Sequence, residues 1–174
     1  AQWLALMGTN PSAHQDPSCP VECVSWDDCQ EFVAKLNARL KGRTASLPTE
    51  AEWEYACRAG TTTKWSFGDS PSGIGDHAWL ASNSEKKTHP VGQKTPNAWG
   101  LYDMHGNVWE WCQDWYGPYR GDETDPTGPA EGVARCWRGG SFTSEPTHAR
   151  SAHSLWCAPE WAKGVDTGFR VLIR

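Results

Sequence analysis

Apolar residues recur at helical spacing near the start of the chain, in residues 25–42. Ser25 is a suitable N-cap for this helix, acidic residues follow it in the first turn, and Gly42 marks the expected end. The pattern predicts an amphipathic helix with one buried stripe, formed by Cys29, Phe32, Val33, Leu36 and Leu40.

A second helix is predicted over residues 49–60, because Thr49 and Glu52 have the spacing of a capping box. Helical periodicity is absent from 61–106 and 116–134. Both stretches are rich in Gly, Pro, Asp, Asn, Ser and Thr, the residues typical of turns and loops. We therefore expect two early helices followed by a half of the chain that is dominated by loops.

Strict alternation at 108–112 predicts a strand with Trp109 and Trp111 on one face and Glu110 on the other. A closing strand is predicted at 168–174, where three apolar residues share a face: Phe169, Val171 and Ile173. Helices early in the chain and short antiparallel strands later on indicate an α+β fold.

Composition narrows the classes of function. The chain has 174 residues, which suits one domain, and a net charge of -5, which argues against a nucleic-acid-binding protein. No apolar run is long enough to span a membrane. The 7 cysteines form no CxxC pair, so neither a zinc ribbon nor a disulfide framework is predicted. The nearest two, Cys19 and Cys23, are either a disulfide or two unrelated thiols.

Four stretches occur in an order that goes beyond periodicity: SLPTEAEWEYACRAG at 46–60, NAWGLYDMHGNVWEWCQDW at 97–115, RGGS at 138–141 and GFR at 168–170. This set resembles the formylglycine-generating-enzyme, or sulfatase-modifying-factor, superfamily. The resemblance implies a variant of the C-type lectin fold. It also implies that residues 1–174 form one domain that lacks the N-terminal segment of the family members. An N-terminal domain outside this chain is expected as a partner.

The same resemblance bears on catalysis. The superfamily's enzymes oxidise a substrate cysteine with two copper-binding cysteines, three and eight residues beyond the serine of the GGS turn. Counted from Ser141, these positions hold Ser144 and Ala149. A hydroxyl and a methyl group cannot replace two soft thiolate ligands of Cu(I). We therefore expect neither copper nor a catalytic residue, and interpret the chain as a non-enzyme.

Metal binding is expected in the segment 102–111 instead. Buried carboxylates must be paired or bound to a cation, and carboxylate and carbonyl oxygens suit calcium. The alternative is a salt bridge from Glu110 to an arginine, namely Arg138, Arg150 or Arg170. By position the resemblance implies a structural calcium held by Asp103, the carbonyls of Gly106 and Val108, and Glu110.

Two histidines and a cysteine lie close together in the sequence, at His148, His153 and Cys157. Their spacings of five and four residues allow a transition-metal site. The interpretation we favour is that they are surface-loop residues that happen to lie near one another.

The segment 142–167, between RGGS and GFR, mixes aromatic, polar and acidic residues without periodicity. A heterogeneous segment between fixed strands is typical of a binding surface. Trp156 and Trp161 are candidate aromatic anchors. The other candidate ligand-binding residues are Phe142, Thr143, Ser144, Glu145, His148, His153, Ser154 and Leu155.

A second resemblance concerns the same segment. It is similar to the region that varies in the bacterial variable proteins of diversity-generating retroelements, which use this fold. We therefore interpret the chain as a ligand-binding module for a protein or small molecule, at the cell surface if it is a variable protein. The alternatives are a family member with a single dedicated partner, a copper-dependent oxidase of the formylglycine-generating type whose ligands are not recognised, and a family member that modifies a protein or small molecule.

Overall fold

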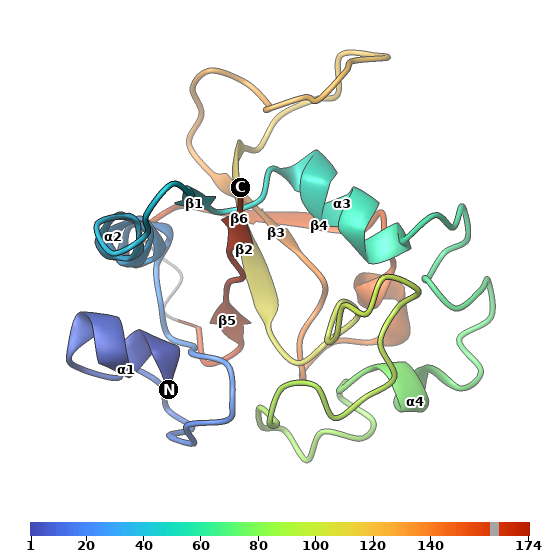
Figure 1. Cartoon of the computed structure of the whole chain (residues 1–174). Coiled ribbons are helices and arrows are strands. Elements are labelled where there is room, and N and C mark those ends of the chain that lie inside the picture. The colour runs from blue at the N-terminus through green and yellow to red at the C-terminus, as the bar shows by residue number, and fades with distance from the viewer. Residues whose placement is uncertain (161–163) are drawn as a thin grey trace.

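The predicted strand around Trp109 is part of β2 (Trp109–Trp115), an inner strand of a four-stranded sheet. In the computed structural model, which describes residues 1–160 and 164–174, the strand order is β4-β3-β2-β5 (Figure 1). β3 (Arg135–Arg138) runs antiparallel to β2, and β4 (Ser154–Cys157) antiparallel to β3. β5 (Thr167–Gly168) joins the other edge of β2 in parallel. The fold is α+β, as expected.

Helices cover both faces of this sheet. α1 (Gln2–Met7) and α2 (Trp26–Asn37) lie on one face, and α3 (Glu50–Arg58) lies on the other (Figure 1). Ser25 and Thr49 cap α2 and α3 as predicted, each through a capping box. α2 ends before Gly42, because the Asn37 amide bonds the backbone N–H and C=O of Ala45 and draws the chain into a strand.

Among residues 1–160 and 164–174, three groups of buried side chains form the core. Neighbouring residues of β2 point to opposite faces, so that Trp111 enters the α2-side core and Cys112 the α3-side core. The α2-side core consists of Trp3, Val24, Cys29, Phe32, Leu47 and Trp111. The α3-side core consists of Trp53, Cys57, Met104, Cys112 and Cys136. The third group lies around α4 (Ile74–His77) and contains Trp65, Ile74, Ala78, Leu80 and Ala149.

The C-terminal strand is shorter than predicted and is divided in two. β5 pairs with β2, whereas β6 (Leu172–Ile173) pairs with β1 (Ala45–Ser46) in a separate two-stranded sheet. Gly168 is required in β5, because a Cβ there would lie 2.4 Å from the carbonyl oxygen of Val21. The C-terminal segment thus adds one short strand to each of the two sheets.

Long irregular segments connect these elements, as the turn-rich composition predicts. The loop 116–134 projects from the rest of the fold (Figure 1). None of the described helices is long and apolar enough to cross a membrane. The 7 cysteines are all free thiols, so Cys19 and Cys23 do not form a disulfide.

Candidate functional site

The segment that begins with the RGGS turn connects two neighbouring antiparallel strands, β3 and β4. It departs from β3 at Arg138 and returns at Ser154, the residue that pairs with Arg138 in β4. Gly139 and Gly140 make the departure possible with φ angles of +97° and +78°. A Cβ on Gly140 would lie 3.2 Å from Ala149, so the turn packs directly on the short 3-10 helix η1 (Pro146–Ala149). Residues 139–153, called the excursion below, are therefore held at both ends by strand pairing and in the middle by the contact between Gly140 and Ala149.

Two of the predicted ligand-binding residues lie inside the fold. Phe142 is 2% exposed and packs edge-on against His14. Ser144 is buried, and its hydroxyl accepts a hydrogen bond from the N–H of Ser141. The prediction that these two side chains lie on the exposed face is wrong, because the GGS turn directs them inward.

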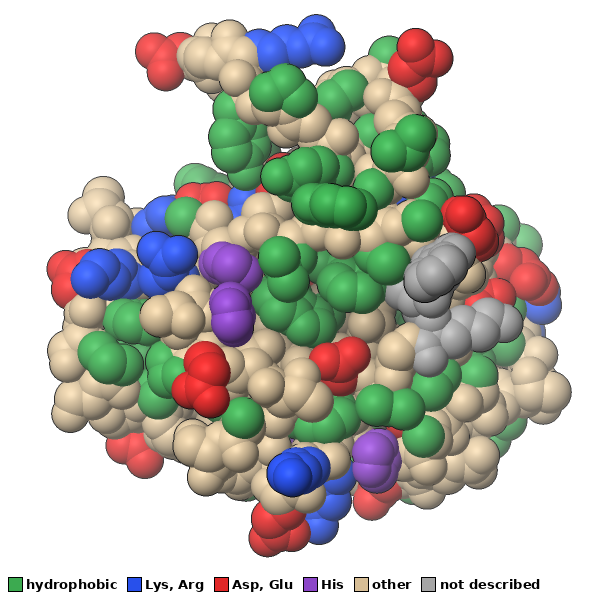
Figure 2. Space-filling model, turned by 180° about the vertical axis from the view of Figure 1, so that it is seen from behind, with side chains coloured by type: hydrophobic (Ala, Val, Ile, Leu, Met, Phe, Trp, Pro, Cys, Tyr) green, Lys and Arg blue, Asp and Glu red, His purple; other side chains and the backbone are tan. Residues whose placement is uncertain are grey.

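The remaining predicted residues in the described part do reach the surface. Trp156 is 58% exposed and its ring lies 5.9 Å from that of Tyr116. Thr143, Glu145, His148 and Leu155 are exposed, and His153 and Ser154 are half-buried. Figure 2 shows a pair of histidines beside a hydrophobic area on one face of the molecule. Trp161 lies outside the described residues.

Tyr116 was missed by sequence reasoning, which assigned it to a solvated loop. Its N–H bonds the carbonyl of Ala134, so the base of the projecting loop is closed next to β4. A single tyrosine at the edge of a turn-rich segment gives no periodic signal. Only the strand pairing brings it to Trp156.

His148 and His153 lie side by side, with ring centroids 5.1 Å apart. Burial lowers the pKa of His153, and the neighbouring His148, Arg150 and Arg138 lower it further. At neutral pH His153 is therefore uncharged. Cys157, whose spacing also allowed a transition-metal site with the two histidines, packs against the α2-side core instead.

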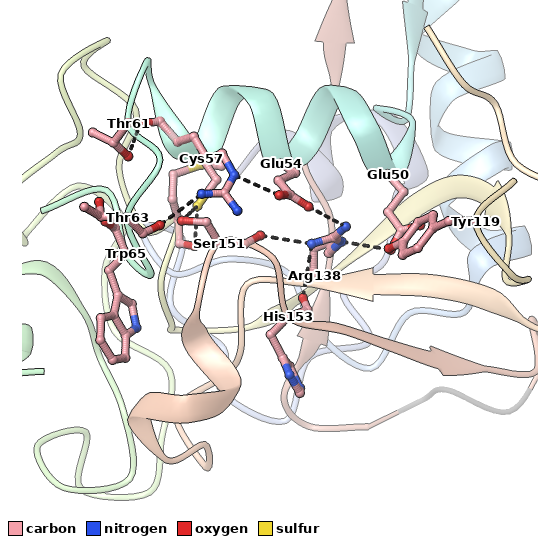
Figure 3. Close-up of polar contacts among 12 residues, drawn as sticks. Glu50, Glu54, Cys57, Thr61, Thr63, Trp65, Tyr119, Arg138, Ser151 and His153 are labelled. Atoms are coloured by element: carbon pink, nitrogen blue, oxygen red, sulfur yellow. Dashed lines mark hydrogen bonds and ion pairs between the residues drawn. The ribbon is translucent and has the colours of Figure 1, made fainter. Parts of the chain in front are cut away.

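An ion-pair network under the excursion holds this surface in place (Figure 3). Arg138 is 1% exposed and donates to Glu50 at 3.0 Å and to Glu54 at 3.0 Å, both on α3. Its third nitrogen donates to the carbonyls of Ser151 at 2.9 Å and His153 at 3.4 Å. One buried guanidinium thus joins α3 and β3 to the turn that carries His153.

Hydroxyl groups and a carboxylate join the two ends of the segment 142–167. Asp166 accepts hydrogen bonds from the hydroxyls of Ser141 and Thr143, each at 2.9 Å. The start of the excursion is thereby fixed next to β5. The exposed Thr143 side chain is held in one position rather than left free.

The two positions that hold copper-binding cysteines in the family's enzymes lie in the interior. Ala149 is completely buried, and its carbonyl is bonded to Nδ1 of His105 at 2.8 Å. The thiol of Cys57 is also close to this turn, 3.6 Å from the hydroxyl of Ser151. Burial raises the pKa of Cys57 to about 12, so its sulfur is a protonated thiol and a poor metal ligand.

Glu110 has an arginine partner. Nη2 of Arg170 donates to one carboxylate oxygen at 2.7 Å, and Nε of Arg170 and the indole N–H of Trp53 donate to the other. Of the three arginines considered, Arg170 makes this ion pair, whereas Arg138 pairs with Glu50 and Glu54. The buried carboxylate is therefore paired with the Arg170 guanidinium.

Asp103 has a different environment. One of its oxygens accepts the N–H of Gly92 at 2.9 Å, while the other is buried without a partner. Asp103 lines a cavity of about 360 Å³, together with Gly106, Val108 and Glu110. The unpartnered oxygen and the nearby carbonyls fit an oxygen-preferring cation, whereas Glu110 is already engaged by Arg170. No described group of three or more His, Cys, Asp or Glu side chains is arranged to hold a metal ion.

The fold and the excursion on it define a C-type-lectin-like domain of the formylglycine-generating-enzyme type. Residues 1–174 match the sulfatase-modifying factor enzyme 1-like domain, and the chain belongs to that family. A formylglycine-generating enzyme of Streptomyces coelicolor is 36% identical over 98% of this chain and 57% of its own length. The chain thus spans between about two fifths and three fifths of the formylglycine-generating enzymes it matches.

Solved structures show the same fold. Treponema denticola variable protein 1 has a TM-score of 0.89 and 33% identity, over 97% of this chain and 79% of its own. PvdO from Pseudomonas aeruginosa has a TM-score of 0.81 and 28% identity, over 99% and 74% of the two chains. The chain is therefore similar both to proteins named as enzymes and to a protein named as variable.

Proposed function

We propose that this protein is a non-catalytic binding module whose ligand contacts β4 and the exposed side chains of the excursion. The observation that carries the proposal is the position of Trp156, which is 58% exposed on a strand whose backbone is fully paired with β3. An exposed tryptophan on a rigid strand is a typical anchor for a partner, because little conformational entropy is lost on binding. Thr143, Glu145 and His148 of the excursion are also exposed, and Leu155 is exposed on the other face of β4.

The residues at the two positions where the family's enzymes are expected to carry copper-binding cysteines support binding rather than catalysis. Ser144 and Ala149 carry no sulfur, and Cys57 nearby is a protonated thiol. Copper chemistry requires soft thiolate ligands. The alternative is an oxidase like the formylglycine-generating enzymes, which the 36% identity to the Streptomyces coelicolor protein favours.

Within this class, we propose a variable protein of a diversity-generating retroelement. The structural likeness to Treponema denticola variable protein 1 supports this. Many residues of 142–167 are also reachable by adenine-directed mutagenesis of asparagine codons. Trp156 is not among them and would be fixed in the template. A reverse-transcriptase gene and a near-copy of the coding segment for 135–174 beside this gene are expected. A gene neighbourhood with neither would favour a dedicated partner.

Truncation of Trp156 tests the binding surface. Peptides selected from a displayed random library on the purified domain provide the probe, and titration calorimetry measures their affinity. Trp156→Ala is expected to weaken binding by about 2 kcal/mol, roughly thirtyfold, because interface anchors carry most of the binding energy. Trp99→Ala is the matched control, since Trp99 is also exposed (47%) but packs on Tyr55 of α3.

Two results would contradict the proposal. One is equal affinity of the selected peptides for the wild type and Trp156→Ala. The other is copper-dependent conversion of a cysteine-containing peptide to formylglycine. The oxidation product is detected by mass spectrometry, so the two functions are distinguished on the same protein preparation.

We also propose that calcium binds at Asp103 and stabilises the domain. Calcium is expected to raise the melting temperature and a chelator to lower it, because a ligand of the native state stabilises by mass action. Asp103→Asn should remove this response, whereas Asp122→Asn in the exposed loop should keep it. Differential scanning calorimetry measures both. If neither calcium nor the chelator changes the melting temperature, the calcium proposal is wrong, and the Arg170–Glu110 ion pair alone accounts for the buried carboxylate of this segment.

A further inference from the structure

The imidazole rings of His148 and His153 lie next to each other on one face of the domain. No described residue hydrogen-bonds to either ring, and Nε2 of His153 is buried without a partner. Nδ1 of His14 is also buried without a hydrogen-bond partner, but it lies 3.5 Å from a carboxylate oxygen of Glu22. Two other imidazoles are hydrogen-bonded. His105 is bonded through both ring nitrogens, and Nε2 of His89 lies 2.7 Å from the carbonyl of Ser84.

The separation of the two rings is that of two histidines on one metal ion. Zinc–nitrogen bonds of about 2.0–2.1 Å and a tetrahedral angle place two coordinated imidazole centroids about 5 Å apart. The observed centroid distance is 5.1 Å, with the ring planes inclined by 52°.

The backbone that carries these rings is fixed before any ligand arrives. His148 lies on η1, whose last residue, Ala149, is fully buried. The turn to His153 is held by Arg138, which donates to the carbonyls of Ser151 and His153 (Figure 3). The ring of His153 also packs 6.0 Å from that of Trp109. Preorganised ligands of this kind reduce the conformational cost of binding a metal.

We propose that His148 and His153 form a two-histidine site for a divalent transition metal of the zinc type. Neutral imidazole is a preferred ligand of such metals, and water or a donor from a bound molecule completes the coordination. Cys157 is not a ligand, because it packs against the α2-side core. The site goes beyond the proposed function and does not depend on it, since zinc binding needs no contact with Trp156.

Zinc titration of the intact chain tests the site. Calorimetry with zinc chloride should show one ion bound per chain, and the ring ¹H–¹⁵N signals of His148 and His153 should shift together. His148→Ala and His153→Ala should each weaken binding about tenfold or more, since each removes one of two protein ligands. His77→Ala, whose ring stacks on Phe67 instead, should bind zinc as the wild type does.

Cysteine thiols can also bind zinc, and Cys157→Ser tests whether the thiol of Cys157 contributes to the measured affinity. Unchanged affinity in Cys157→Ser, with loss in the histidine variants, supports the site. The proposal is overturned if zinc does not bind, or if it binds His148→Ala as tightly as the wild type. It is also overturned if only Cys157→Ser loses affinity. His148 is exposed, so its replacement leaves the core unchanged and the test does not depend on refolding a damaged protein.

Discussion

Replacing Arg138 with methionine is expected to lower the free energy of unfolding by about 3–5 kcal/mol, the usual cost of removing one partner from a buried ion pair. The side chains of Glu50 and Glu54 are only 12% and 26% exposed, and both lose their contact with the guanidinium. The carbonyls of Ser151 and His153 lose a donor as well. Chemical denaturation of the variant measures the loss.

Two further variants separate the charge from the packing. Adding Glu50→Gln and Glu54→Gln to Arg138→Met should recover part of the stability, because neutral amides need no cation. Lys35→Ala, which breaks the exposed pair between Lys35 and Glu31, should cost less than about 1 kcal/mol. A cost for Arg138→Met as small as that for Lys35→Ala would contradict the role given to this network.

Trp111→Ala is expected to destabilise the domain by about 3–5 kcal/mol, the range for deleting a large aromatic side chain from a core. Trp111 is completely buried, its ring lies 5.1 Å from that of Trp137, and its indole N–H donates to the carbonyl of Val24. The substitution leaves a cavity in the α2-side core and an unpaired carbonyl. Thermal and urea denaturation measure the effect.

Trp156→Ala is the matched control on the same sheet. With 58% of Trp156 exposed, its removal should change the free energy of unfolding by no more than about 1 kcal/mol. Equal destabilisation by the two substitutions would show that Trp156 is a packing residue and would remove the anchor from the proposed binding surface.

The two longest helices, α2 and α3, and the central strand could be predicted from the sequence because their signals are local, whereas the short helices α1 and α4 were not predicted. The capping boxes at Ser25 and Thr49 confirm the starts of α2 and α3. The alternation around Glu110 correctly placed Trp109 and Trp111 on one face, where both pack with Trp137. In each case the pattern involves residues that are only two or three positions apart in the sequence.

β3 and β4 could not be predicted, because long-range pairing defines them. Residues 154–157 have no apolar alternation, and they form a strand only because Ser154 and Cys157 pair with Arg138 and Arg135. The burial of Phe142 and Ser144 follows from the two left-handed glycines before them, which turn the chain inward. The partner of Glu110 was open among three arginines for the same reason. Arg170 is 60 residues from Glu110 in the sequence, and the sequence alone does not show that the two side chains are in contact.

Because the excursion 139–153 starts and ends at residues that face each other, Arg138 and Ser154, it behaves as a replaceable cassette. Lengthening a closed loop costs little, about 0.6 kcal/mol for each doubling of its length. The constraint lies in its inward-facing side chains, Ser141, Phe142, Ser144, Ala149 and Ser151, which are buried in the scaffold. A grafted sequence that keeps these five positions could therefore change both the length and the chemistry of the exposed face while the sheet beneath it stays the same.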